Sequence, residues 1–244
     1  MIQFSIFIYP KLIVESYIYY IKKLQLISIL KFTIIWPIIL IVSLLNILFL
    51  SLDNLLFSFK GIEVNKPLFI VGFPRSGTTF LHKVISKDKQ FTTPKLWELL
   101  FAPSISQKYI FAFLFIILKP LKSLSGFLNP LSGSKINDLH EIQLNNPEED
   151  YLAFIPYGAC FILILFFPVK DIWKLLDFDN SYDISHKNRL MRIYKKLVQR
   201  HLYFHGKDKI YMTKNPSFTS MIESLNLEFP DCCQIGCHRK PHKA

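Results

Sequence analysis

The chain has 244 residues, of which 51% are hydrophobic, and it carries a formal net charge of +11. This length is enough for one sizeable α/β core, and the positive charge favours acidic partners. The lysines and arginines are scattered rather than gathered into one stripe, which argues against a nucleic-acid-binding protein.

The first 60 residues are unusually apolar. Residues 32–50 contain no charged side chain, and about 20 apolar residues suffice for a helix that spans a bilayer. Residues 2–21 are interrupted by Lys11 and Glu15, which is typical of a helix lying in the membrane interface. We therefore expect a membrane-associated helical segment over residues 1–60 and an α/β domain over residues 61–244.

Two membrane arrangements agree with this segment. In the first, residues 32–50 make a single span; lysines precede it and Asp53 follows it, so the positive-inside rule leaves the N-terminus in the cytoplasm and the domain across the membrane. In the second, apolar helices lie on the membrane face and the domain stays in the cytoplasm. The sequence leaves both arrangements open.

The motif P-R-S-G-T-T at residues 74–79 is the most informative feature of the domain. It follows a strand predicted at residues 68–71 and precedes a helix predicted at residues 79–86. Gly72 and Gly77 have the spacing of a phosphate-binding G-x-x-x-x-G loop, but threonines follow where nucleoside-triphosphate enzymes carry Lys and then Ser or Thr. Free N–H groups at a helix start suit phosphate or sulfate oxygens. The motif therefore predicts an anion site that is not built for ATP or GTP.

The remaining chain alternates between predicted strands and helices. The apolar run at residues 152–169 contains two prolines and a glycine, so we expect a buried helix rather than a span. Further on we expect an amphipathic helix at 188–205, a strand at 210–213, a helix at 218–229 and a strand at 233–237. This order predicts a P-loop-type α/β fold, with a parallel sheet flanked by helices and the loop at the carboxyl end of a strand.

Several ordered blocks resemble the sulfotransferase family that uses 3′-phosphoadenosine 5′-phosphosulfate (PAPS), in its membrane-associated branch. P-R-S-G-T-T resembles that family's 5′-phosphosulfate loop. Residues 91–103, the H-E and P-E-E-D pairs within residues 139–150, and the K-N-P, F-P-D and R-K-P groups within residues 214–241 follow in the family's order. The likeness covers roughly residues 60 to 241 and implies transfer of a sulfuryl group from PAPS to a hydroxyl acceptor.

The resemblance assigns roles in donor binding. Loop residues would hold the 5′-phosphosulfate, and Arg239 would hold the 3′-phosphate. Lys214 would support the leaving phosphate or the transferring sulfuryl group, and Arg75 would neutralise charge on the bridging oxygen. No metal is implied. The loop residues in question are Pro74, Arg75, Ser76, Gly77, Thr78 and Thr79.

The acceptor hydroxyl needs a base, and two residues compete for that role. Glu98 stands where tyrosine-directed members place a catalytic Glu, and burial against Trp97 and Phe101 would have to raise its pKa. His140 is the rival, because cytosolic members use a His whose ordinary pKa is better suited. The apolar surroundings favour a lipid or sterol hydroxyl, with a carbohydrate as a further acceptor class.

Two other clusters suggest metal sites but have simpler explanations. The acidic residues 148–150 lack further ligands at metal spacing, which favours a solvated loop or helix cap. Cys232, Cys233 and Cys237 lie near His238, but the spacing fits no common zinc site and Cys233 and Cys237 fall in a predicted core strand. We therefore expect buried free thiols.

The end of the sequence leaves alternative functions open. In the family, a Ser that also holds the 3′-phosphate follows the Arg, whereas only five residues follow Arg239 here; the resemblance therefore implies a domain incomplete at its C-terminus. The main alternative is a truncated, inactive relative that binds a membrane or a partner. A kinase or other nucleotide hydrolase is disfavoured, because the loop Lys and a second Mg²⁺-holding Asp are missing. In a eukaryote the resemblance implies a Golgi location, and in a bacterium the cytoplasmic membrane face.

Overall fold

The computed structural model describes residues 4–118 and 147–239. Its sheet has four parallel strands in the order β2-β3-β1-β4. The strands are β1 (Leu68–Gly72), β2 (Phe91–Thr92), β3 (Ile210–Lys214) and β4 (Cys233–Cys237). The predicted parallel sheet is confirmed, and the short strand β2 is an addition that no sequence pattern indicated.

Helices surround the sheet and fill the rest of the described chain. The longer ones are α1 (Tyr9–Lys22), α2 (Leu26–Leu56), α3 (Thr78–Ile85), α5 (Ile105–Leu118) and α8 (Ile184–His205). The shorter α-helices are α4 (Leu96–Phe101), α6 (Lys170–Trp173), α7 (Phe178–Ser181) and α9 (Ile222–Glu228). Six 3₁₀ segments of the described residues complete the list: η1 (Ile6–Ile8), η2 (Phe59–Gly61), η5 (Asp150–Tyr157), η6 (Phe161–Leu165), η7 (Lys174–Asp177) and η8 (Pro216–Ser220).

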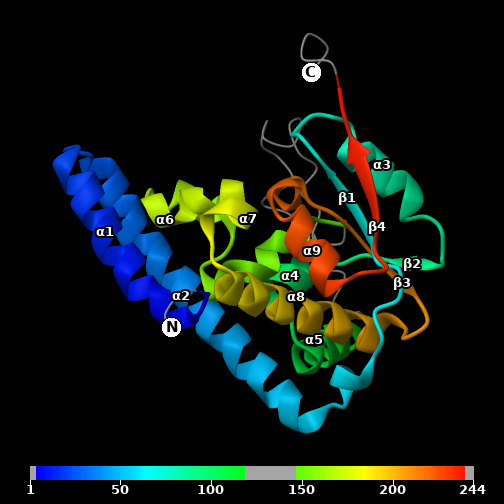
Figure 1. The fold of residues 1–244 in the computed structure, drawn as a ribbon. Helices are drawn as coiled ribbons and strands as arrows, with labels where there is room; N and C mark the ends of the chain where they lie inside the picture. Colours follow the sequence, from blue (N-terminus) through cyan, green and yellow to red (C-terminus); the bar gives the residue numbers. More distant parts are fainter. Residues whose placement is uncertain (1–3, 119–146, 240–244) are drawn as a thin grey trace.

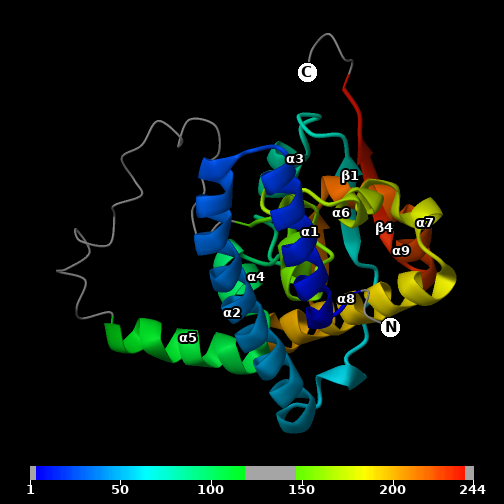
Figure 2. The same cartoon turned by 90° about the vertical axis from the view of Figure 1, so that its left-hand side faces the viewer.

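Figure 1 shows α1 and α2 as a long antiparallel pair on one flank, the sheet on the other, and α8 running between them. In the turned view of Figure 2, α5 extends away from the body beside α2. Helix α8 begins four residues before the predicted start, because the Asp183 side chain caps it by accepting a hydrogen bond from His186 N at 2.9 Å.

The N-terminal helices share one apolar core with the rest of the chain. Phe4, Tyr9 and Leu12 are buried in the same cluster as residues of η5, η6 and α8. The Tyr9 hydroxyl donates to Ile155 O at 2.5 Å, and Lys11 forms an ion pair with Asp171. Helix α1 therefore packs against the sheet domain, and both membrane arrangements stay predictions.

Helix α2 is joined to the domain by a buried charge. The fully buried Asp53 accepts hydrogen bonds from the backbone N–H groups of Ile105 and Ser106, at 2.7 and 3.1 Å, and so caps α5. Its carboxylate also pairs with Arg200 of α8 at 3.2 Å. The rest of α2 is long and apolar enough to cross a membrane, which by length and composition alone is weak evidence for a span.

Two predicted helices are broken in the structure. The run 152–169 was expected to be one buried helix; it is buried but forms the separate segments η5 and η6. Gly158 ends η5 with φ +63°, and a Cβ there would lie 2.4 Å from Ile8 Cγ2, so only glycine fits. The helix expected at 218–229 likewise divides into η8 and α9 at Met221.

Strand β4 lies at the edge of the sheet rather than in its core. Cys233 is exposed, and Cys232 and Cys237 are only half-buried. The prediction of buried thiols is therefore wrong for these three residues, because an edge strand has a neighbour on only one side. Cys160, for which no such prediction was made, is buried and has its pKa raised by burial.

Candidate active site

The loop between β1 and α3 is held in a conformation that only particular residues tolerate. Gly72 has φ +142°, and a Cβ there would lie 2.4 Å from the carbonyl oxygen of Cys237. Gly77 has φ +96° and is the N-cap of α3. Arg75 has φ +66° without being glycine, a conformation that costs about 1 kcal/mol or more. Such strain is typical of ligand-binding loops.

The loop presents hydrogen-bond donors that the fold itself does not use. The backbone bond from Leu81 N to Gly77 O, at 3.1 Å, is the first of α3, so the N–H groups before it face the loop. The Ser76 hydroxyl is buried and has no hydrogen-bond partner among the described residues. A buried polar atom without a partner is costly, and a bound phosphate or sulfate oxygen would supply the partner.

Lys214 lies beside this loop at the carboxyl end of β3. Its ammonium group donates to the Thr79 hydroxyl at 3.2 Å and forms an ion pair with Glu149. Pairing of β3 with β1 places Lys214 opposite Ile70, so the sheet register brings the lysine to the loop. The structure thus joins two residues that the sequence predicted for donor binding, and it adds Glu149 to them.

His82, one turn into α3, is a buried neighbour that the sequence analysis did not single out. Its Nε2 lies 2.8 Å from the Thr93 hydroxyl. Burial, followed by the positive charge of Lys214, lowers the pKa of His82 to about 4. His82 is therefore neutral at physiological pH, and its place on the inner face of α3 is the only sequence signal that could have indicated burial.

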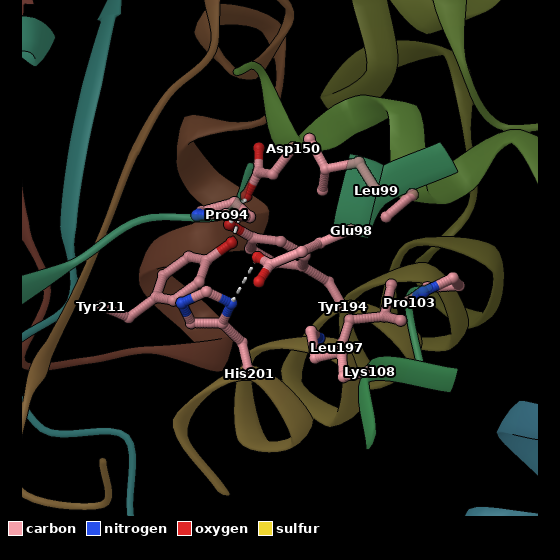
Figure 3. Close-up of a pocket in the computed structure, with 11 residues that line it drawn as sticks. Pro94, Glu98, Leu99, Pro103, Lys108, Asp150, Tyr194, Leu197, His201 and Tyr211 are labelled. Atoms are coloured by element: carbon pink, nitrogen blue, oxygen red, sulfur yellow. Dashed lines mark hydrogen bonds and ion pairs between the residues drawn. The ribbon is translucent and has the colours of Figure 1, made fainter. Parts of the chain in front are cut away.

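Glu98 lies deeper, at the contact between α4 and α8, in the region shown in Figure 3. It is 1% exposed. Its carboxylate accepts from Lys95 N at 3.1 Å as part of a capping box, and it lies 2.7 Å from His205 Nε2 and 3.6 Å from His201 Nδ1. None of these partners belongs to the loop.

The pKa of Glu98 moves opposite to the expected direction. Burial alone would raise it, but the hydrogen bond from His205 and the charges of Lys108 and the two histidines lower it to about 2. The net shift is therefore opposite to the raised pKa that the role of general base requires. The physical reason is that α8 and α5 bring cationic and hydrogen-bonding groups to the carboxylate, and those groups are far away in the sequence.

Asp150 corrects the interpretation of residues 148–150 as a solvated acidic loop. It is 1% exposed and accepts hydrogen bonds from Tyr194, Tyr211 at 2.9 Å and Asn215 at 3.1 Å. Burial raises its pKa, against these hydrogen bonds. Asp150 therefore ties η5 to α8 and β3, and it positions the neighbouring Glu149 at Lys214.

A cleft of about 640 Å³ opens beside the loop. Gly72, Phe73 and Pro74 form one wall, and η8 and α9 form another. Asp177, Asp179 and Glu223 give the far wall an acidic character. The cleft is large enough for a small molecule, and its acidic wall suits a neutral or cationic ligand better than an anion.

The remaining predicted site residues lie in different parts of the structure. Thr78 is buried at the start of α3. Arg239 lies two residues beyond β4, at the same edge of the sheet as the loop, because Cys237 pairs with Gly72. Glu98 is separate from this edge. His140 lies outside the described residues.

Comparison with known proteins identifies relatives of this arrangement. A sequence model of the Sulfotransferase family matches residues 67–244, well over half of the chain. Among curated proteins, no sequence matched.

Two solved structures share the fold. Sulfotransferase STF9 from Mycobacterium avium aligns with a TM-score of 0.58 at 20% identity, over 79% of this chain and 47% of that one. Sulfotransferase STF1 from Mycobacterium tuberculosis H37Rv aligns with a TM-score of 0.51 at 16% identity, over 84% of this chain and 53% of that one. The chain thus spans about half the length of each of these structures.

Proposed function

The chain belongs to the sulfotransferase family, and from this premise we propose that it transfers the sulfuryl group of PAPS to a hydroxyl acceptor. The observation that carries the proposal is the pairing of a donor-rich loop with Lys214. The buried Ser76 hydroxyl has no partner among the described side chains, and Lys214 contacts Thr79 of the same loop. A phosphosulfate group would satisfy both.

The donor would lie on residues Pro74 to Thr79, with its negative charge facing Arg75 and Lys214. The strained backbone of Arg75 supports this role, because strain of that kind persists where a ligand needs a fixed geometry. Arg239, at the same edge of the sheet, would bind the 3′-phosphate. Sulfuryl transfer then depends mainly on positioning and on stabilising the charge that spreads over the reacting oxygens.

In the reaction, the acceptor oxygen forms a bond to sulfur while the bond from sulfur to the phosphate oxygen breaks. The acceptor proton must pass to a base. Glu98 is the base expected from the sequence, but its low pKa and its partners on α8 oppose that role. Glu149 is the better-supported carboxylate, since its ion pair with Lys214 holds it next to Thr79. His140 remains a sequence-based prediction.

For the acceptor we propose the cleft beside Gly72 to Pro74. Its acidic wall would repel the polyanionic donor and leave room for an uncharged hydroxyl compound. Helix α2 exposes an apolar face that includes Ile34, Ile38 and Ile41, which supports membrane association with the helix lying in the plane of the membrane. A lipid or sterol hydroxyl is therefore the favoured acceptor class, and a carbohydrate the next.

Calorimetry with 3′,5′-adenosine bisphosphate tests the donor site directly. We expect binding by the 244-residue chain and its loss in Arg75→Ala. Arg192→Ala is the matched control, because Arg192 is exposed on α8 and bonds only within its own helix. Binding that survives Arg75→Ala, or that is absent from the unmodified chain, would contradict the proposal.

The alternative is an inactive relative that binds a membrane or a partner. Incubation with PAPS carrying labelled sulfate, together with a panel of lipid, sterol and carbohydrate alcohols, distinguishes the two. Labelled product supports the enzyme. Adenosine bisphosphate binding without any labelled product would support the alternative.

A further inference from the structure

We propose that Glu98, His201 and His205 form a binding site for a divalent transition-metal ion, with Zn²⁺ as the best match. One ligand atom from each residue lies within 4.8 Å of the others. Two imidazoles and one carboxylate are a donor set that zinc uses widely. The site is distinct from the phosphosulfate loop, and it does not depend on the chain being a sulfotransferase.

Secondary structure brings the three ligands together. His201 and His205 are four residues apart on α8, so both side chains project from the same face of the helix. Their ring centroids are 4.3 Å apart. Glu98 approaches this face from α4, with its carboxylate held by the capping box on Lys95 N. Two rigid elements thus present the donors before any ion binds.

The distances between donors need only small adjustments. Glu98 Oε1 lies 2.7 Å from His205 Nε2, and Glu98 Oε2 lies 3.6 Å from His201 Nδ1. Ligands at about 2.0–2.1 Å from a tetrahedral zinc ion are about 3.3 Å from one another. The distances from the two carboxylate oxygens to the two imidazoles lie within about 0.6 Å of this value. The imidazole nitrogens, which lie within 4.8 Å of each other, would complete the geometry by a closer approach.

The hydrogen bonding of His201 favours a cation at this point. Its Nε2 lies 2.8 Å from the Thr92 hydroxyl, while Nδ1 is buried and has no hydrogen-bond partner among the described residues. When Nε2–H donates to Thr92, Nδ1 turns a lone pair toward the Glu98 carboxylate, as Figure 3 shows for the ring orientation. Two lone pairs facing each other repel, and a metal ion between them would bind both.

The structure has room for a fourth ligand and a route by which an ion can enter. Glu98 and His201 line a small cavity of about 20 Å³ that also touches Asp150 and Tyr211, and a space of this size holds one water molecule. The His205 side chain is 22% exposed, so an ion can reach the site from solvent along α8. The site would therefore be three protein ligands and one water.

Lys108 is the feature that opposes a cation here. It is buried beside Glu98, and its charge interacts with that carboxylate. An ion at the site must compete with this ammonium group, which predicts a moderate affinity and a specific test. Replacing Lys108 by the similarly shaped Met should strengthen metal binding about tenfold or more, because a nearby positive charge is removed.

A bound metal ion would cross-link α4 to α8, because its ligands come from both helices. This cross-link would hold the segment from β2 to α4 against the sheet. A carboxylate that coordinates a metal cannot at the same time accept a proton. The metal proposal therefore assigns Glu98 a ligand role and leaves proton acceptance to Glu149.

Cobalt titration of the detergent-solubilised full chain, after treatment with a chelator, tests the proposal. We expect one equivalent of Co²⁺ to give visible d–d absorption that Zn²⁺ abolishes by competition. His205→Ala and Glu98→Gln should each weaken binding at least tenfold. His186→Ala removes a half-buried histidine at the other end of the same helix and should leave binding unchanged. Absence of stoichiometric binding, or binding that His205→Ala leaves intact, would overturn the proposal.

Two further measurements guard against misfolded variants and a rival site. Zn²⁺ should raise the thermal midpoint of unfolding of the unmodified chain and of Lys108→Met, and it should do so at a lower concentration in Lys108→Met.

The rival metal site would use Cys232, Cys233 and Cys237, which lie near His238 in the sequence. Metal binding that is lost in Cys237→Ser but kept in His205→Ala would place the ion there and refute the Glu98 site.

Discussion

The carboxyl edge of β1 and β3 and the contact between α4 and α8 contain similar residue types but hold them differently. At the sheet edge, the Ser76 hydroxyl is buried without a partner among the described residues, and Lys214 bridges the loop and Glu149. At the helix contact, Glu98 is surrounded by basic groups, and the nearby Asp150 of η5 receives donors from three side chains.

The difference shows why a buried carboxylate that follows an anion-loop motif in the sequence is an insufficient sign of catalysis. At the helix contact the carboxylates accept hydrogen bonds from within the fold, although His201 Nδ1 has no partner among the described residues. The sheet edge keeps donors and charges available for a ligand, at a cost in backbone strain at Arg75. Four experiments test this contrast.

The largest expected effect is on stability at Asp150, which joins η5 to α8 and β3. Asp150→Ala would leave the Tyr194, Tyr211 and Asn215 donors unsatisfied in a buried region, so we expect a loss of about 3–5 kcal/mol in the free energy of unfolding. Urea unfolding measures it. The control is Asp208→Ala at an exposed turn, and similar losses in both variants would show that the Asp150 network is unimportant.

At the sheet edge, Lys214→Met should strongly reduce the rate of sulfate transfer while the variant still folds. Removing the cation from the transferring group should lower the rate of sulfate transfer about 10²–10³-fold, as measured with labelled PAPS. Lys87→Met, in the exposed turn after α3, should retain full activity. A Lys214→Met rate within a few-fold of the unmodified chain would remove this lysine from the proposed site.

The neutral state of His82 predicts a pH dependence of stability. An unfolded His takes up a proton near pH 6.5, whereas folded His82 does so only near its pKa of about 4. The stability is therefore complete above about pH 6.5 and is lost as the pH falls toward 4, by about 3 kcal/mol. Denaturant midpoints across this range measure the loss. In His82→Gln the loss attributable to this residue should disappear, and an unchanged profile would refute the assignment.

The smallest expected effect separates the two carboxylates proposed as the base. Glu149→Gln should lower kcat about 10²-fold, while Glu98→Gln should reduce it much less, because Glu98 has no contact with the loop. Steady-state rates with a fixed acceptor compare them. The reverse order would restore the original assignment of Glu98 as the base.

Local sequence patterns were sufficient for several elements. The glycine spacing of residues 72–77 predicted both the turn and the helix after it, since φ above zero is accessible mainly to glycine. Strands β1 and β3 and helix α8 follow from short apolar runs and a 3.6-residue period. Patterns of this kind depend only on neighbouring residues in the chain, so the sequence was sufficient to predict these elements.

Other features depended on groups from distant parts of the chain. The break between η5 and η6 depends on the close approach of Ile8 to Gly158, and the packing of α1 depends on contacts with Ile155 and Asp171. The predicted domain boundary near residue 60 stays a prediction, although residues on both sides of it share one core.

For the site, the order of residues along the chain was enough to predict an anion-binding loop and to show the family resemblance, because both depend on consecutive residues. Which charged groups surround the loop depends on the folded arrangement. Parallel pairing of β1 with β3 brings Lys214 to Thr79, and packing of α8 on α4 places two histidines on Glu98. A pKa depends on the distance to charges and on burial, and neither quantity exists until the chain is folded.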